Sequence, residues 1–231
     1  MNKVKSSNEG LNYSKKEVYR FYIMGAISFV VLILFLGAIR VTFKDGVGSL
    51  DQEVINFVNG IRNENYTRLF TFLTYIGNPS SMIMITLITA LALDRYYEKK
   101  SGRFFICNIL YVWILNTFIK YMVKRPRPFV TRLVEAKGYS FPSAHAMVSM
   151  AATLLGVYFI FKAVQNKKRK YIFSMSLALL GILIGISRAY LGVHYLTDII
   201  AGWGISIIWC IMSVQLYELK KSKNKEGVRS Y

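Results

Sequence analysis

The chain has only two histidines among its 231 residues, and one of them precedes a carboxylate at helical spacing. In the segment SRAYLGVHYLTDII, His194 lies four residues before Asp198. If a helix begins around Gly192 or Val193, both side chains lie on one face, one turn apart. Asp198 can then accept a hydrogen bond from one ring nitrogen and leave the other with a free lone pair. This spacing favours an oriented base or nucleophile over the alternative, a purely structural interfacial pair.

The second histidine follows a predicted helix start, in the segment FPSAHAM. Pro-Ser before an apolar run is typical of a helix N-terminus, with Ser143 as its N-cap. Free backbone N–H groups and the positive end of the helix then lie beside His145 and can bind an anion. The alternative is an ordinary cap with an incidental histidine.

Three cations stand close to these segments in the sequence. Lys120 and Arg127 belong to KYMVKRPRPFVTR, in which the prolines predict that a helix ends near Lys124 and that Arg127 folds back from the following loop. The third is Arg188. The alternative for such residues is that they extend to lipid headgroups from helix ends.

Long apolar runs must position these residues. Hydrophobic residues make up 54% of the chain and charged residues 18%, which argues against the alternative of a water-soluble all-α bundle. Several runs approach the roughly 20 residues that cross hydrocarbon. We therefore predict one integral-membrane domain of class all-α, a six-transmembrane-helix bundle with spans at residues 21–39, 79–93, 104–122, 144–161, 171–186 and 198–216.

The second span follows a break in the apolar pattern, GNPSS at Gly77–Ser81. Proline suits the first turn of a helix better than its interior, so Leu69–Ile76 is predicted to be a separate, shallow segment. The preceding residues 45–68 predict an amphipathic helix in the outer interface, with an ordinary surface helix as the alternative. Its apolar positions at helical spacing are Leu50, Val54, Phe57, Val58 and Ile61.

The formal charge of +18 reflects membrane topology. Basic clusters occupy residues 1–20, the loops after the second and fourth spans, and the tail at 217–231. These segments alternate along the chain, so the positive-inside rule predicts both termini in the cytoplasm and the histidine segments outside. Anionic lipid headgroups are the expected counter-charge, and nucleic acid is not an expected partner. The basic loop 120–137 breaks the rule, which indicates that its charges have a function.

The chain ends and cysteines add three expectations. The first apolar run follows a charged 20-residue segment and lacks a small-x-small cleavage site, so we predict a retained span and not a signal peptide. Cys107 and Cys210 fall inside apolar runs, so no disulfide framework is expected. The terminal KKSKNKEGVRSY is predicted to be a disordered basic tail.

Together, these residues describe a site at the outer membrane interface. Fixed cations and a helix N-terminus stabilise negative charge, an oriented histidine can attack, and a second histidine can donate a proton. The combination predicts phosphoryl transfer through a covalent phosphohistidine.

The three motifs K-x6-RP, PSxH and SR-x5-H-x3-D occur here in this order, between Lys120 and Asp198. In this they resemble the type 2 phosphatidic acid phosphatase family of integral-membrane lipid phosphatases. The resemblance implies that His194 is the nucleophile, that Asp198 orients it, and that His145 is the general acid. It also implies a metal-free phosphate site, formed by Lys120, Arg127, Arg188, Ser143 and the backbone N–H of Ala144. The family usually has glycine where this chain has Ala144, which costs little if this position is helical.

The sequence therefore predicts a lipid phosphate phosphatase that needs no metal or other cofactor. It is expected in the plasma membrane of a bacterium, where it acts at the outer leaflet. The resemblance favours phosphatidylglycerophosphate or undecaprenyl pyrophosphate as substrate, with phosphatidate and diacylglycerol pyrophosphate as alternatives; no obligate protein partner is indicated. A binder or transporter of anionic lipids needs the cations but has no use for the spacing of His194 and Asp198. A phosphotransferase to an acceptor other than water is the third alternative. Turnover is expected to need neutral His194 and protonated His145, which gives a bell-shaped pH profile.

Overall fold

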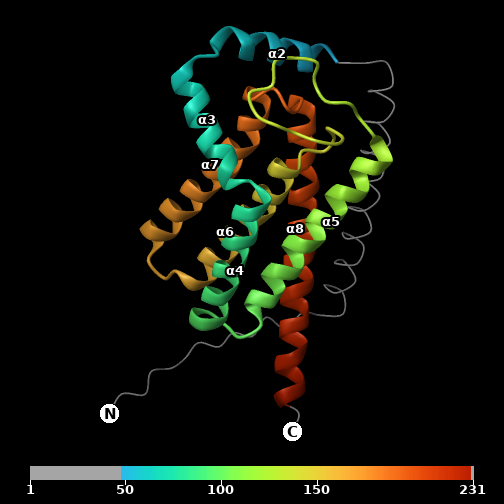
Figure 1. Cartoon of the computed structure of the whole chain (residues 1–231). Helices are drawn as coiled ribbons and strands as arrows, with labels where there is room; N and C mark the ends of the chain where they lie inside the picture. Colours follow the sequence, from blue (N-terminus) through green and yellow to red (C-terminus); the bar gives the residue numbers. More distant parts are fainter. Residues whose placement is uncertain (1–47, 230–231) are drawn as a thin grey trace.

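The computed structural model describes residues 48–229, and within this range the chain is all-α without strands. Helices α4 to α8 run roughly along one direction, and α2 lies across one end of them (Figure 1). Helix α3 leads from α2 to α4. The elements are α2 (Ser49–Ile61), α3 (Glu64–Ile76), α4 (Pro79–Tyr96), α5 (Ser101–Val123), α6 (Ala144–Ala163), α7 (Lys167–Tyr190) and α8 (Leu196–Arg229).

Helix α6 forms the centre of the bundle. Its fully buried side chains, among them Met147 and Leu155, pack against α5 and α8. Small residues let its neighbours approach closely, as expected for helices packed in a membrane. At Gly202 of α8, an added Cβ would lie 3.1 Å from the carbonyl oxygen of Ser143. This close approach brings the start of α8 against the start of α6, where both histidine segments are located.

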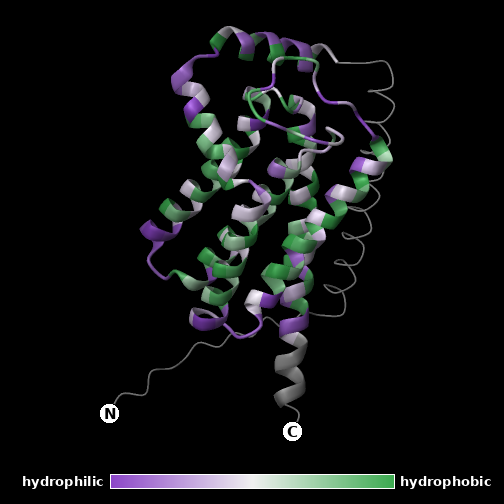
Figure 2. Cartoon of the chain, in the orientation of Figure 1, coloured by the Kyte–Doolittle hydropathy of each residue, from purple (hydrophilic) through white to green (hydrophobic). Residues whose placement is uncertain are grey.

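Hydrophobic residues predominate along the middle of the helices, and hydrophilic residues gather toward the two ends of the bundle (Figure 2). Large apolar side chains of α4 and α5 are more than half exposed, including Leu91 at 72% and Phe118 at 60%. Exposed apolar surface of this extent is not stable in water and indicates a lipid environment. The bundle is therefore a membrane domain, as the sequence predicts.

The number of spans differs from the prediction. Among the described residues, four helices are long and apolar enough to cross a membrane, namely α5, α6, α7 and the part of α8 up to Ser222. Helices α3 and α4 meet at 52° and together make a fifth candidate, a broken span. The predicted separate segment Leu69–Ile76 is thus the second half of α3, and the predicted span at 79–93 is part of α4. The predicted span at 21–39 and the N-terminal residues 1–20 lie outside the described residues, so the count of six stays a prediction.

Two helix ends differ from expectation. The last helix begins at Leu196 and not at Gly192 or Val193, because the chain makes a turn through Gly192 at φ +73°. The predicted disordered tail is wrong over most of its length, since α8 continues through Arg229. The predicted amphipathic helix within 45–68 is present as α2, and its location in a membrane interface stays a prediction.

Candidate active site

His194 lies in a short turn between α7 and α8, at the end of the bundle that α2 crosses (Figure 1). The backbone N–H groups of Val193 and His194 both donate to the carbonyl of Arg188, at 3.1 and 3.3 Å. Gly192 allows this turn, because its φ is +73° and an added Cβ would lie 2.9 Å from the carbonyl oxygen of Thr131. The turn holds His194 with 4% of its surface exposed.

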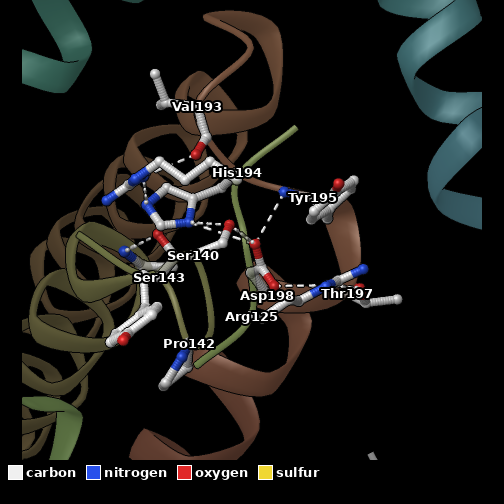
Figure 3. A network of polar contacts seen from close by, with 12 residues as sticks. Arg125, Ser140, Pro142, Ser143, Val193, His194, Tyr195, Thr197 and Asp198 are labelled. Atoms are coloured by element: carbon white, nitrogen blue, oxygen red, sulfur yellow. Dashed lines mark hydrogen bonds and ion pairs between the residues drawn. The ribbon is translucent and has the colours of Figure 1, made fainter. Parts of the chain in front are cut away.

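The contacts of His194 assign its tautomer. Arg127 places a guanidinium nitrogen 3.1 Å from Nε2 of His194. Arginine only donates hydrogen bonds, so Nε2 carries a lone pair and the ring proton lies on Nδ1. Nδ1 faces Oδ2 of Asp198 at 3.4 Å and Oγ of Ser140 at 3.3 Å (Figure 3). The lone pair of Nε2 is therefore the one available for nucleophilic attack.

Asp198 is fully buried in the first turn of α8 and is held by several donors. Ser140 donates its hydroxyl to Oδ2 at 2.5 Å, and the backbone N–H of Tyr195 donates to the same oxygen at 2.9 Å. The contact with Tyr195 resembles half of a capping box, in which an acid in the first turn satisfies the N–H at the start of the helix. Asp198 is thus near His194 as predicted, although His194 itself precedes the helix.

The other carboxylate oxygen of Asp198 is bound by Arg125, a residue to which sequence analysis assigned no role in the site. Arg125 is 5% exposed and forms ion pairs with Oδ1 of Asp198 at 2.6 Å and with Oδ2 of Asp51 at 2.7 Å. Asp51 belongs to α2 and also accepts the backbone N–H of Thr197 at 3.0 Å. Arg125 therefore connects the predicted interfacial helix to the carboxylate behind His194. Figure 3 shows its contact with Asp198.

The three predicted phosphate-binding cations come together around the histidines. Lys120 lies in the last turn of α5 and donates to the carbonyl of Tyr139 at 2.7 Å. Arg188 is buried and donates to Oγ1 of Thr74 at 2.5 Å, while its Nε has no hydrogen-bond partner among the described residues. A buried cation with an unused donor suits a pocket that binds an anion.

The segment FPSAHAM forms the start of α6 as predicted. Ser143 is the N-cap, and its Oγ accepts the backbone N–H of Ala146 at 3.5 Å. Ala144 is the first helical residue and does not have a positive φ, so the missing glycine causes no backbone strain. Nε2 of His145 lies 2.9 Å from Oδ1 of Asn78, and Arg188, His194, Arg127 and Lys120 are all within electrostatic range of the His145 ring. The structure thus brings the predicted residues together around the two histidines.

Sequence analysis missed four supporting residues, namely Asp51, Asn78, Arg125 and Ser140. Two signals pointed toward them. The basic loop 120–137 violated the positive-inside rule without an assigned role for Arg125, and the break GNPSS contained a polar residue, Asn78, between apolar segments. Asp51 gave no signal, because one acid on an amphipathic helix is an ordinary surface residue.

Burial determines the protonation state of His194. Removal from water lowers the pKa of His194 from 6.5 to about 3, and Arg127 and Lys120 act in the same direction. The hydrogen bond to Asp198 and its charge oppose this change in pKa without cancelling it. The imidazole is therefore neutral near pH 7, as a nucleophile must be.

This low pKa predicts how folding stability depends on pH. The pKa of His194 is lower in the folded than in the unfolded chain, so below pH 6.5 the unfolded chain binds a proton there that the folded chain does not. The free energy of unfolding is therefore unaffected by this residue above pH 6.5 and decreases as the pH falls toward 3. At pH 5 the loss amounts to about 2 kcal/mol. We expect the melting temperature of the detergent-purified protein to fall between pH 7 and pH 4.5, with a smaller decrease in His194→Gln. Equal decreases in both proteins would contradict the assignment.

The sequence comparisons identify the family. Residues 101–222, more than half of the chain, match the model of the PAP2 superfamily. The chain belongs to the PAP2 superfamily. This PAP2 member is 27% identical to phosphatidylglycerophosphatase B of Bacillus subtilis, over 77% of this chain and 88% of that protein. It is 28% identical to an undecaprenyl-diphosphatase of Sulfolobus acidocaldarius, over 86% of this chain and 91% of that protein.

Solved structures support the fold of this PAP2 member. The crystal structure of a transmembrane PAP2-type phosphatidylglycerolphosphate phosphatase from Bacillus subtilis matches with a TM-score of 0.74 and 24% identity, over 84% of this chain and 96% of that one. LpxE of Aquifex aeolicus matches with a TM-score of 0.58 and 21% identity, over 77% of this chain and 98% of that one. The described helices therefore form a PAP2-type fold.

Proposed function

We propose that this PAP2 member is a membrane-embedded phosphatase that removes phosphate from a lipid phosphomonoester or pyrophosphate through a phosphohistidine on His194. The observation that carries the proposal is the lone pair on Nε2 of His194. It is oriented by Asp198 and Ser140 on one side of the ring and lies beside Arg127 on the other. This nucleophile lies among cations at the end of an apolar bundle.

In the first step, Nε2 of His194 attacks phosphorus and forms an N–P bond while the bond between phosphorus and the lipid oxygen breaks. Protonated His145 donates its proton to the leaving oxygen, which departs as an alcohol or a phosphate. Lys120, Arg127 and Arg188 stabilise the charge on the remaining phosphate oxygens. Asp198 stabilises the positive ring of His194, whose proton stays on Nδ1.

In the second step, water hydrolyses the phosphohistidine. Neutral His145 takes a proton from the water molecule as its oxygen forms a bond to phosphorus, and the N–P bond breaks. His194 is released neutral, inorganic phosphate leaves, and His145 is again protonated for the next turnover. Each histidine therefore returns to its starting state.

The geometry favours hydrolysis over simple binding of an anionic lipid. A binder needs only the cations, whereas here a serine, a carboxylate and a buried arginine converge to orient His194. We also propose a mechanism without a metal ion. Asp198 is already paired with Arg125, and a divalent cation would be repelled by the cations that surround the histidines.

The substrate class is argued from the bundle and from the relatives. The exposed apolar sides of α4 and α5 favour a substrate that approaches from the lipid phase. Among such lipids, phosphatidylglycerophosphate and undecaprenyl pyrophosphate are the preferred candidates, because two relatives carry names for activity on these compounds. The basic loops between α4 and α5 and between α6 and α7 lie toward the end opposite the site, which supports a site that faces outward (Figures 1 and 2).

The test is phosphate release by the purified protein in detergent, with phosphatidylglycerophosphate, undecaprenyl pyrophosphate, phosphatidate and diacylglycerol pyrophosphate as substrates. We expect turnover of at least one of them, undiminished by EDTA. Orthovanadate should inhibit, because vanadate adopts the five-coordinate geometry of phosphorus during the transfer.

Two results would contradict the proposal in different ways. No phosphate release from any of the four lipids would overturn the assignment as a phosphatase. Activity that is abolished by chelation and restored by Mg²⁺ would leave the phosphatase in place but overturn the metal-free mechanism.

A further inference from the structure

The corner between α3 and α4 supports the catalytic pocket from one side. This corner, residues Thr74–Asn78, overlaps the start of the break at Gly77–Ser81 that interrupts the apolar pattern of the sequence. Its first residue, Thr74, is 3% exposed and accepts a hydrogen bond from Arg188 at 2.5 Å. Its last residue, Asn78, contacts His145. The corner therefore touches two of the residues to which we assign a role in catalysis.

The side chain of Asn78 is not used to cap its own helix. Asn78 occupies the N-cap position of α4, where asparagine normally accepts a backbone N–H of the first turn. Here the side chain makes no such hydrogen bond, and its Oδ1 lies 2.9 Å from Nε2 of His145 instead. The preference of asparagine for helix starts thus explains the residue type but not the direction of its side chain.

Close packing fixes the same edge of the histidine ring. At Gly77, an added Cβ would lie 2.9 Å from Cδ2 of His145 and 2.6 Å from Cγ2 of Ile184. The backbone of the corner therefore lies directly against the Cδ2 side of the ring, and a side chain at this position would force Ile184 or the ring to shift. Gly77 and Asn78 together leave His145 little freedom to rotate.

We propose that Asn78 is the positioning residue of the general acid His145. This inference rests on the proposed phosphatase function. A carbonyl oxygen only accepts hydrogen bonds, so Nε2 of His145 carries a proton permanently directed at Asn78. The proton that His145 gives to the leaving oxygen is therefore the one on Nδ1. The N–H bond at Nδ1 breaks, the O–H bond of the leaving alcohol forms, and Asn78 keeps the remaining proton in place.

The charged groups around His145 affect its protonation, and therefore the pH dependence of the activity. Arg188 of α7, Arg127 of the α5–α6 loop and Lys120 of α5 act on the ring, together with His194. These are the largest charged influences on the ring, and none of them is a carboxylate. A carboxylate introduced at position 78 would be a new negative partner in direct contact with Nε2, and it would favour the protonated acid form.

The experiment compares Asn78→Leu and Asn78→Asp with the wild type on two substrates. One is a lipid phosphomonoester, whose alkoxide leaving group needs a proton, and the other is p-nitrophenyl phosphate, whose leaving group does not. For Asn78→Leu we expect kcat to fall about 10- to 100-fold on the lipid and only a few-fold on the aryl phosphate. For Asn78→Asp, which keeps an acceptor at this place, we expect the alkaline limb of the pH profile to move to higher pH.

Ser81→Ala is the matched control, because Ser81 donates to the carbonyl of Tyr75 in the same corner but does not contact His145. It should behave as the wild type on both substrates. The inference is wrong if Asn78→Leu loses the same factor on both substrates, if the pH profile of Asn78→Asp overlays that of the wild type, or if Ser81→Ala reproduces either change. A wild-type protein without activity on lipid phosphates would instead overturn the proposed function, and the role of Asn78 with it.

Discussion

His194→Ala abolishes phosphate release, with an expected decrease in turnover of about 10⁴-fold or more. The reason is that Nε2 of His194 is the nucleophile, and no other described side chain places a lone pair beside Arg127 and Asp198. Binding of the phosphorylated lipid should remain within a few-fold of the wild type, because Lys120, Arg127 and Arg188 are retained. The measurements are phosphate release and equilibrium binding of the same lipid in detergent.

A covalent label makes this prediction specific. Wild-type protein quenched during turnover of a ³²P-labelled substrate should carry acid-labile, base-stable radioactivity, as phosphohistidine does, whereas His194→Ala should carry none. A variant that keeps more than a tenth of wild-type turnover would rule out His194 as the nucleophile. A variant that loses lipid binding together with activity would point to a role of His194 in binding alone.

Arg125→Met is expected to damage both folding and catalysis. The substitution leaves Asp51 and Asp198 buried without their shared cation, and removing one partner of a buried ion pair typically costs about 3–5 kcal/mol. It also releases the carboxylate that orients His194, so phosphate release should fall on the order of 10²-fold in the protein that remains folded. Melting temperature and specific activity measure the two effects separately.

Two variants separate the contributions of Arg125. Arg132→Met removes the same charge from an exposed position of the same loop and should leave stability nearly unchanged, with a smaller loss of activity than Arg125→Met. Adding Asp51→Asn to Arg125→Met removes one of the two unpaired carboxylates, so it should restore part of the stability but not the activity. If the double variant recovers activity in proportion to stability, Arg125 supports folding only and does not position Asp198.

The membrane fold was largely predictable because its signal is composition over long stretches. The helices α5, α6 and α7 begin and end within a few residues of the predicted spans, and the prediction that a helix ends near Lys124 matches the end of α5 at Val123. The bend between α3 and α4 was recognised as a break, but its angle depends on packing against α7 and could not be read from the pattern. The start of α8 was misplaced because the sequence pattern does not show that Gly192 adopts a positive φ.

In the site, too, the motif residues could be predicted from the sequence, whereas the residues that hold them in place could not. Residues with specific chemistry at fixed spacing, such as His194 and Asp198, could be proposed from the sequence. Asp51 lies 147 positions before Asp198, and only the docking of α2 onto the bundle brings the two to opposite sides of Arg125. Contacts of this range depend on tertiary structure, and a single sequence contains no local pattern for them.

The oxygen Oδ2 of Asp198 accepts two hydrogen bonds, one from the hydroxyl of Ser140 and one from the backbone N–H of Tyr195 at the start of α8. Loss of this carboxylate removes the hydrogen bond that starts α8 and, at the same time, the group that orients the nucleophile. We therefore expect loss of Asp198 to lower the stability of the fold as well as to stop catalysis. Natural variants that persist in the membrane without turnover should therefore carry their changes elsewhere in the pocket.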